Sequence, residues 1–229
     1  MIVAAERQEM APLARRLRSP ERLEIGLPWA LSGQLGGLPV ALAAGRSGRA
    51  NAISAVERAA KSFSLRGLVS TGWCGALDPG LHAGQVVLAD RVLTLDGAGE
   101  FSAQHPGGRA ATGPVLTVDH FVGATEEKRR LRQTGAIAVE MEAAAVAVEA
   151  QQRGIPFYCV RAVSDVAEKE LLVDFNRARL PGGQFSAARA AAQAGLSPRR
   201  WSELLEMWRN ARAAAEALGE FLGSCRFDC

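Results

Sequence analysis

Short apolar runs alternate with alanine-rich segments of helical periodicity over most of the chain. The apolar runs are four to seven residues long and predict buried strands; they span residues 1–5, 38–44, 67–71, 86–90, 91–94, 115–119 and 157–163. The segments between them predict helices, at residues 6–17, 50–63 and 126–133 and after the strand that ends near residue 140. This alternation of strands and helices favours an α/β domain.

The later part of the chain is less regular until its last helix. Residues 96–113 contain Gly and Pro with little apolar periodicity and predict a long loop. Residues 171–196 are interrupted by Pro181-Gly182-Gly183, and a cover over an active site is one interpretation. Residues 197–222 predict an amphipathic helix, because Ser197 and Pro198 suit its first positions and an apolar stripe follows: Trp201, Leu204, Leu205, Trp208, Ala211, Ala215, Leu218 and Leu222. Without repeats or a low-complexity linker, residues 1–229 are expected to form a single domain.

Composition removes several classes of function. The 229 residues are 48% hydrophobic and 22% charged, and the net charge of +3 is carried almost wholly by scattered arginines, which argues against a nucleic-acid surface. The four cysteines form no CxxC pair and share no metal-ligand spacing with the three histidines, so we expect neither a metal nor a cofactor. Their use fits a reducing cytoplasm. The apolar start is too short for a signal peptide, and no run approaches the ~20 residues of a membrane span, so no membrane partner is expected.

Acidic residues follow two of the predicted strands. Glu140 and Glu142 flank Met141 where a strand gives way to an alanine-rich helix, and Ser164-Asp165 ends the strand that begins at residue 157. Carboxylates are costly to bury at such places unless they are paired or functional. The two places therefore predict one acidic pocket.

Four motifs together resemble the nucleoside phosphorylase superfamily. In chain order they are TGWCGALDPGL at residues 71–81, GQVV at 84–87, VEME at 139–142 and VRAVSD at 160–165. The match is nearest to the branch of methylthioadenosine/S-adenosylhomocysteine nucleosidases, futalosine hydrolases and hopanoid-associated phosphorylases. Order and spacing agree over residues 1–175 and only loosely beyond.

The resemblance implies one α/β domain with a mixed central β-sheet flanked by helices, forming a homodimer or larger homo-oligomer. It also implies cleavage of the N-ribosidic bond of a purine nucleoside, with adenine as the expected base and a modified 5′ group. Hydrolysis is the expected reaction, and the small-molecule nucleoside is the expected partner.

Asp165 matches the general acid of the family. A purine leaves poorly as an anion, and a carboxyl group beside N7 can protonate it if burial keeps the group protonated near neutral pH. Ser164 is placed to hold the Asp165 carboxyl by a hydrogen bond. The alternative for Asp165 is a structural residue that caps the next helix.

Glu142 matches the glutamate that accepts hydrogen bonds from both ribose hydroxyls, where its charge also favours an oxocarbenium-like sugar. Met141 is expected to pack against the ribose, although a core methionine is nearly as good an interpretation. Gly75 of the glycine motif is counted with the substrate-binding residues. Strand alternation turns Glu140 away from Glu142, so Glu140 is expected behind the pocket or exposed.

The water-activating glutamate of the nucleosidases lies in the first helical turn after the first strand. Glu9 fits that position because Met10 and Leu13 then fall where the family has apolar residues. Glu6 competes with it, and both residues are also open to interpretation as surface charges of a helix.

The family binds the base with an aromatic ring and adjoining backbone groups. Phe121 matches the ring that stacks on adenine, and Val122 is expected to offer its N–H and C=O. His120 is interpreted as a solvated loop histidine.

Trp73 departs from the family pattern, which has a small or hydroxyl-bearing residue there. Phosphorylases that bind phosphate through an arginine carry it where this chain has Ser70. Both departures favour hydrolysis, or a 5′ group that packs on the indole of Trp73. The loop at residues 45–49, GRSGR, lies at a helix N-terminus and carries two arginines, a combination that suits anions. Phosphorolysis, with phosphate as partner, therefore remains the alternative. A non-catalytic nucleoside binder remains a third interpretation if Trp73 blocks the site.

Overall fold

The computed structural model describes residues 1–97 and 99–227 and is built around one mixed β-sheet. The strand order is β10-β6-β8-β9-β5-β1-β4-β3-β2, with β7 on the outer side of β6. The strands are β1 (Ile2–Ala4), β2 (Arg18–Arg22), β3 (Trp29–Leu35), β4 (Leu38–Ala44), β5 (Leu68–Ala76), β6 (Val86–Thr94), β7 (Glu100–Ser102), β8 (Ala111–Thr117), β9 (Ala138–Glu140) and β10 (Phe157–Asp165). Together with the flanking helices this sheet confirms the predicted α/β fold class.

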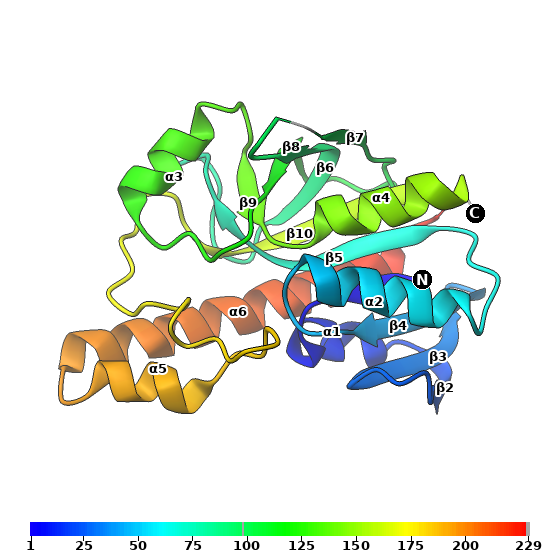
Figure 1. Cartoon of the computed structure of the whole chain (residues 1–229), viewed down its shortest axis with the longest axis horizontal. Helices are drawn as coiled ribbons and strands as arrows, with labels where there is room; N and C mark the ends of the chain where they lie inside the picture. Colours follow the sequence, from blue (N-terminus) through cyan, green and yellow to red (C-terminus); the bar gives the residue numbers. More distant parts are fainter. Residues whose placement is uncertain (98, 228–229) are drawn as a thin grey trace.

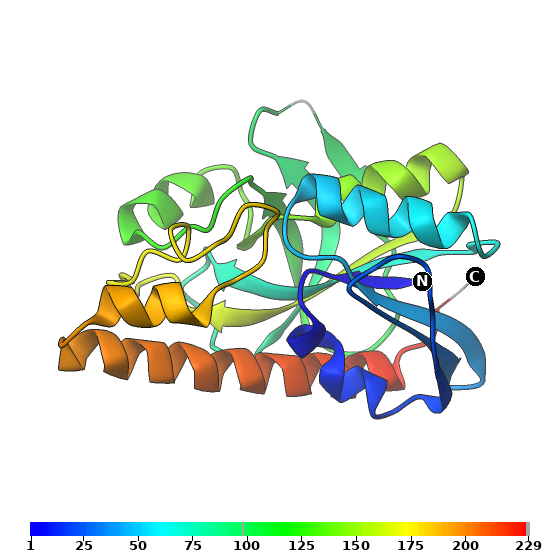
Figure 2. The ribbon, with the colours of Figure 1, turned by 60° about the horizontal axis from the view of Figure 1, so that its bottom comes forward.

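Helices cover both faces of the sheet (Figure 1). The helices are α1 (Arg7–Ala14), α2 (Arg49–Ala60), α3 (Thr125–Arg132), α4 (Ala143–Arg153), α5 (Ala187–Ala194) and α6 (Pro198–Ser224). Helices α2 and α4 pack together on one side, and α1 packs on α6 on the other. Figure 2 shows α6 running the length of the molecule, with α5 folded back along its first half.

Half of the sheet closes on itself. Strand β10 pairs in parallel with β5 and antiparallel with β6, so β5, β9, β8, β6 and β10 form a ring, while β1, β4, β3 and β2 extend it as an open sheet. The register of β10 against β5 shifts between Val163 and Asp165, which is a β-bulge at Ser164. Bulges redirect side chains and are common beside functional sites. This one lies at the end of β10, where the acidic pocket is predicted.

The contact of α1 with α6 follows from the apolar faces of both helices. Met10 and Leu13 of α1 are buried as predicted, and Leu218 and Leu222 of α6 pack in the same core. At Gly219 a Cβ atom would come within 2.6 Å of Pro12 Cβ, so the absent side chain allows the two helices to approach closely.

Several local predictions were wrong or incomplete. Residues 96–113 are not one loop, because they contain β7 and the start of β8; residues 86–94 form one strand rather than two segments. Strand β3 and the edge strand β2 were missed; β2 (RSPER) is polar and fully exposed and carries no strand pattern. Helix α6 is confirmed, but its predicted stripe divides: Leu218 is buried, whereas three large apolar residues are exposed, namely Trp201, Leu205 and Trp208.

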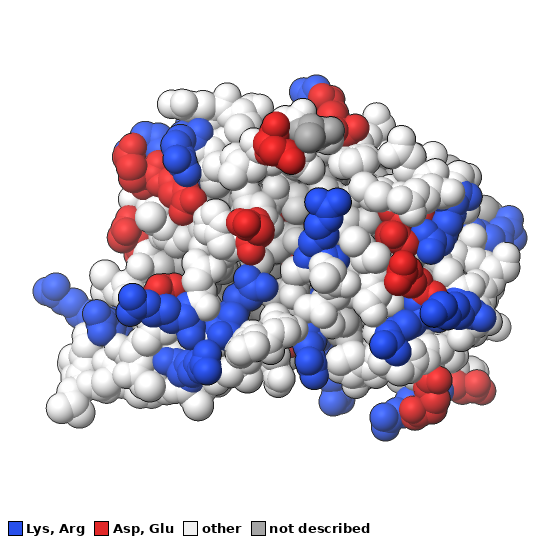
Figure 3. Space-filling model, in the orientation of Figure 1, with Lys and Arg blue, Asp and Glu red and all other residues white. Residues whose placement is uncertain are grey.

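The surface carries charges of both signs. In Figure 3 basic and acidic side chains are interspersed over much of this face, and several basic ones gather over the α5–α6 region at the lower left. Within the described ranges, no helix has the length and apolar character that crossing a bilayer requires.

Leu218→Ala tests the α1–α6 core. Leu218 is 1% exposed, and removing a fully buried leucine side chain costs about 2–5 kcal/mol of unfolding free energy. Leu196→Ala is the control just before the same helix: Leu196 is 101% exposed, so its loss should change the free energy by about 0.5 kcal/mol or less. Urea unfolding measures both, and equal effects would contradict the packing described.

Candidate active site

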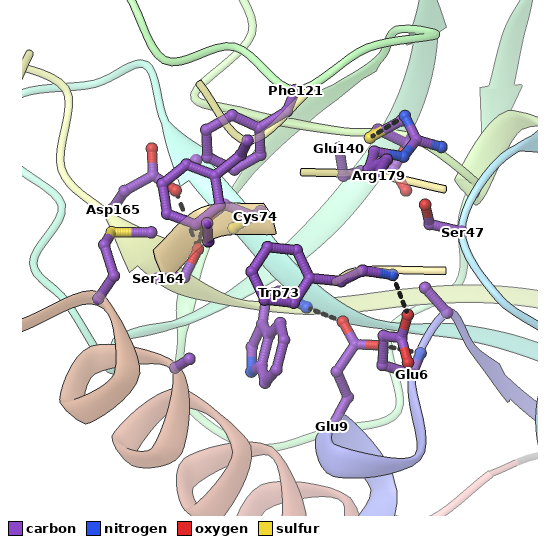
Figure 4. Close-up of a pocket in the computed structure, with 18 of the residues that line it drawn as sticks. Glu6, Glu9, Ser47, Trp73, Cys74, Phe121, Glu140, Ser164, Asp165 and Arg179 are labelled. Atoms are coloured by element: carbon purple, nitrogen blue, oxygen red, sulfur yellow. Dashed lines mark hydrogen bonds between the residues drawn. The ribbon is translucent and has the colours of Figure 1, made fainter. Parts of the chain in front are cut away.

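One cavity of about 490 Å³ collects all the residues that the sequence assigns to the site. It lies where β1, β5, β9 and β10 end or turn, against the first half of α6 (Figure 4). The predicted residues that line it are Glu9, Trp73, Gly75, Phe121, Val122, Met141, Glu142, Ser164 and Asp165. Asp165 and Glu142 therefore face the same space, although they are 23 residues apart in sequence.

The Asp165 carboxyl is buried and is fixed at both oxygens. Ser164 Oγ lies 2.9 Å from Asp165 Oδ1, as the sequence predicted, and Lys128 Nζ lies 2.6 Å from Oδ2. A Cβ at Gly75 would lie 3.0 Å from Asp165 Oδ2, so the absence of a side chain at Gly75 leaves room for the Asp165 carboxyl in the cavity wall. Asp165 is not the N-cap of a helix, because the next helix along the chain is α5, which Ser186 caps.

Glu142 stands at the junction of β9 and α4. Its Oε1 accepts a 2.7 Å hydrogen bond from the Gly48 N–H, the N-cap residue of α2. Burial, followed by the nearby charge of Glu140, raises the Glu142 pKa to about 8. Met141 is half-buried and lines the cavity beside Arg179, whose Nη1 lies 3.9 Å from the Met141 sulfur.

Glu140 lines the cavity and is 5% exposed, so neither of its two expected places, behind the pocket or exposed, is correct. One of its oxygens accepts the N–H groups of Glu142 at 2.9 Å and Ala143 at 2.8 Å, and the same oxygen pairs with the buried Arg161 guanidinium. The other oxygen accepts the Thr117 hydroxyl. Glu140 thereby holds the start of α4, and with it the backbone of Glu142.

Glu9 is 5% exposed, so its interpretation as a surface charge is wrong. Its two oxygens accept the N–H groups of Glu6 at 2.7 Å and Trp73 at 2.8 Å. Gly72 has φ +137° and a Cβ there would lie 2.5 Å from Glu9 Oε1, so only glycine allows this approach. Burial raises the pKa of Glu9 to about 7, against the lowering effect of the two N–H groups and Arg161.

Glu6, the competitor of Glu9, also lines the cavity but is only half-buried. Burial raises its pKa, and its Oε1 lies 3.5 Å from the Phe185 backbone N. Figure 4 shows both carboxyls: that of Glu9 lies beside Trp73, and that of Glu6 lies next to Glu9 on the side away from the indole.

Phe121 and Val122 lie on the segment between β8 and α3. The Phe121 ring contacts the Phe175 ring at 4.9 Å between centroids, and Asn176 bonds both the N–H and the C=O of Phe121 at 2.8 Å. Within residues 1–97 and 99–227, no hydrogen bond engages the Val122 N–H or C=O. His120 precedes them; its hydrogen bond to Asp119 raises its pKa.

Trp73 lines the cavity without closing it. Its indole is half-buried and lies between Glu9 and α6 in Figure 4, and the cavity still reaches both Glu142 and Asp165. Its Nε1 is buried and has no hydrogen-bond partner among the described residues.

A mainly apolar extension of the cavity was not predicted. It is formed by the segment before α5, by α5 itself and by the first half of α6, through Phe175, Phe185, Ala190, Trp201, Leu204, Met207, Trp208 and Ala211. Two sequence signals pointed toward it, the apolar stripe of α6 and the possible cover at residues 171–196, but neither pattern could show that α5 folds back to enclose the space.

Three positively charged residues of the site were also missed, namely Lys128, Arg161 and Arg179. Arg161 interrupts an otherwise apolar strand, and Lys128 shares the buried face of α3 with Leu131; both patterns are visible in the sequence. Arg179 lies in an irregular segment and left no signal. Among the described residues, no group of three or more His, Cys, Asp or Glu side chains is arranged to hold a metal ion.

Comparison with known structures identifies the fold. The nucleosidase of Neisseria meningitidis bound to methylthio-immucillin-A superimposes with a TM-score of 0.71 at 23% identity, covering 97% of each chain. Futalosine hydrolase of Helicobacter pylori gives a TM-score of 0.74 at 17% identity, covering 96% of this chain and 94% of that one. The chain therefore has the fold of these two proteins.

Sequence comparison then gives the family. The family model described as "Phosphorylase superfamily" matches residues 2–108 and 100–193, and the chain belongs to this superfamily. A relative from Mycobacterium bovis, named 5′-methylthioadenosine/S-adenosylhomocysteine nucleosidase, is 30% identical over 77% of this chain and 89% of its own length. A relative of the same name from Listeria monocytogenes is 27% identical over 76% and 89%.

The buried carboxyls predict a pH-dependent stability. Because folding raises the pKa values of Glu9 and Glu142 above the usual 4.5, the folded protein binds protons that the unfolded chain has released, so stability falls as pH rises from about 4.5 through 8. The ligand-free protein should melt at a higher temperature at pH 5.5 than at pH 8. Glu142→Gln should reduce this difference, whereas Glu126→Gln, at an exposed position, should not. An undiminished difference in Glu142→Gln would contradict the assignment.

Proposed function

We propose that the protein hydrolyses the N-ribosidic bond of an adenine nucleoside with an apolar 5′ substituent. The observation that carries this proposal is the meeting of Asp165, Glu142 and Glu9 around one cavity. Three carboxyls from distant parts of the chain supply an acid, a ribose ligand and a water ligand. Such a hydrolysis needs no more functional groups than these. The names of the relatives, which refer to methylthioadenosine and S-adenosylhomocysteine, support the same reaction.

In this proposal Asp165 protonates N7 of the purine. The C1′–N9 bonding electrons then pass into the base, which leaves as neutral adenine rather than as an anion. A positioned general acid contributes about 10²–10⁴ in rate. The hydrogen bond from Ser164 and the contact with Lys128 orient the carboxyl toward the cavity.

Glu142 binds the ribose hydroxyls, and in its ionised form it stabilises the cationic sugar that forms as the bond breaks. Glu9 takes a proton from the attacking water. A base with a pKa of about 7 is half ionised near neutral pH, which suits this task. Glu9 is favoured over Glu6 because the N–H groups of Glu6 and Trp73 hold its carboxyl in the cavity wall.

The base stacks on Phe121, and the free N–H and C=O of Val122 form hydrogen bonds with the edge of the base. Stacking of a base on an aromatic ring contributes about 1–3 kcal/mol. The bonds between Asn176 and the Phe121 backbone fix the ring before the substrate arrives.

The 5′ group is proposed to occupy the apolar extension beside α5 and α6. Its side chains offer rings, methyl groups and a thioether rather than charges, so it favours an alkylthio or larger apolar substituent over a free hydroxyl. Met141 and Trp73 border the ribose between this extension and the catalytic end.

Phosphorolysis is the second candidate, and Arg179 is the observation that favours it. Its side chain lies beside Met141, and its Nε has no hydrogen-bond partner in the described part of the chain. A phosphate near the ribose would find a donor there. Ser47, from the predicted anion loop, also lines the cavity, but its Oγ bonds the Gly183 carbonyl at 3.1 Å.

We also propose that the protein works in the cytoplasm as a homodimer. Trp201, Leu205 and Trp208 are 43%, 59% and 59% exposed and follow one face of α6 beside the cavity. An exposed apolar stripe of this kind is typical of a surface that another chain covers.

The experiment is base release from a panel of nucleosides, with and without phosphate. We expect release of adenine from 5′-alkylthio adenosines in phosphate-free buffer, with the free 5-alkylthioribose rather than its 1-phosphate as the sugar product. Asp165→Asn should lower the turnover by at least about 100-fold, whereas Asp119→Asn, outside the cavity, should not. Release that requires phosphate would establish the second candidate. Wild-type protein that binds nucleosides without cleaving any would contradict both.

Leu204→Ala tests the 5′ site against a matched control. Leu204 lines the cavity, and its neighbour Leu205 does not. Loss of a buried apolar contact of this size costs about 1–3 kcal/mol, so Leu204→Ala should raise KM for a 5′-butylthio nucleoside by about tenfold and change KM for adenosine little. Leu205→Ala should leave both values near those of the wild type. Equal effects of the two variants on KM for the 5′-butylthio nucleoside would place the 5′ group elsewhere.

A further inference from the structure

Helix α3 carries one buried lysine among exposed charges. Its other charged side chains, Glu126, Glu127, Arg129, Arg130 and Arg132, lie toward solvent or pair with one another, but Lys128 is 1% exposed. Burying an ammonium group costs several kcal/mol unless it is paired and hydrogen-bonded. The burial of Lys128 therefore needs a specific structural or functional explanation.

The contacts of Lys128 are all at the end of β10. Its Nζ donates to Asp165 Oδ2 at 2.6 Å and to the Val166 carbonyl at 2.8 Å. The other oxygen of Asp165, Oδ1, is the one that faces Ser164. An ammonium group is a compact point charge, and a guanidinium is larger and planar. Lysine therefore suits this position, where the cation is enclosed and contacts a single carboxyl oxygen.

The approach of α3 to this carboxyl is fixed by contacts at its start. Glu170 accepts the Thr125 N–H at 2.9 Å and the Thr125 hydroxyl at 2.7 Å, and the Leu171 N–H donates to the Gly123 carbonyl. These contacts join α3 to the segment that follows Asp165. Because Phe121 and Val122 lie just before α3, the same contacts set the distance between the base-binding segment and the acid.

We propose that Lys128 is a positioning residue for the acid step of the proposed N-ribosidic cleavage, on which this inference rests. Its ammonium holds Asp165 Oδ2 and leaves Oδ1 to carry the proton toward N7. In the step, the Oδ1–H bond breaks, an N7–H bond forms, and the C1′–N9 electrons enter the base. The negative charge left on Asp165 then lies 2.6 Å from the Lys128 ammonium, which stabilises it.

Ser164 fits this arrangement. Its single hydroxyl proton has two acceptors within reach, Asp165 Oδ1 at 2.9 Å and the Cys74 carbonyl at 3.2 Å. While Oδ1 carries the proton, the Ser164 hydroxyl can donate to Cys74. Once the proton has passed to the base, it can turn and donate to the new carboxylate. Lys128 serves Oδ2 in both states.

The test compares two leaving groups in Lys128→Met, which keeps the length of the side chain and removes its charge. For a 5′-alkylthio adenosine, kcat should fall about 10–100-fold while KM changes less than about threefold. For the matching 4-nitrophenyl riboside, whose leaving group departs without a proton, kcat should stay within about threefold of wild type. Asp165→Asn should show the same split. Lys169→Met, which removes an ion-paired lysine outside the cavity, should affect neither substrate.

A rescue experiment separates charge from packing. In Lys128→Ala, propylammonium should restore part of the lost turnover of the adenine nucleoside, and tetramethylammonium should not. Lys128→Gln, which keeps an N–H donor, serves if the methionine variant does not fold. Equal losses for both leaving groups, or wild-type turnover of the nucleoside in Lys128→Met, would overturn the inference while the proposed function stands. A wild-type protein that cleaves no nucleoside would overturn both.

Discussion

The buried guanidinium of Arg161 is the constraint on which the rest of the site depends. It is 1% exposed, pairs with Glu140 and contacts Ser70 Oγ at 2.6 Å, inside the ring of strands. Three glutamates lie within reach of its charge: Glu140 by direct contact, and Glu9 and Glu142 at longer range. Without this cation Glu9, Glu140 and Glu142 would be buried together with no ion-pair partner among the described residues, a costly arrangement in a medium of low dielectric. One arginine therefore makes an acidic pocket compatible with a stable fold.

The compensation is incomplete, and this is what makes the pocket reactive. Glu9 and Glu142 keep raised pKa values, of about 7 and 8, because burial outweighs the attraction of Arg161 and the N–H groups. Groups balanced between two protonation states near neutral pH are suited to exchange protons and to exchange hydrogen-bond partners with a substrate. Glu140 instead accepts four hydrogen-bond donors of the protein itself, which fix its carboxylate in place. Of the two glutamates in the VEME motif, Glu140 therefore has a structural role and Glu142 a functional one.

How much of the structure the sequence could predict depends on whether a feature leaves a local pattern or arises from residues far apart in the chain. Glu142 and Asp165 each carry a strong local signal, a carboxylate at the end of an apolar strand, and the resemblance to a known family added Glu9 and Phe121. Closure of β10 against both β5 and β6 is a long-range pairing and leaves no local pattern. The same holds for Lys128, whose partner is 37 residues away, and for the enclosure of Leu204 by α5. Polar strand β2 was missed because it is exposed on both faces and so lacks alternation.

The choice between water and phosphate as nucleophile depends on which anion binds at the N-terminus of α2, the Glu142 carboxylate or a phosphate. A free helix N-terminus attracts phosphate through its unpaired N–H groups, and the GRSGR loop suggested such a site. In the structure the Gly48 N–H already bonds Glu142 Oε1, so the protein's own carboxylate occupies this position. A phosphate there would displace Glu142 or lie against its charge. Arg179 would offset part of that repulsion from the other side of Met141. The single cation Arg179 would then have to balance both the Glu142 carboxylate and the incoming phosphate. This arrangement therefore favours neutral water as the nucleophile.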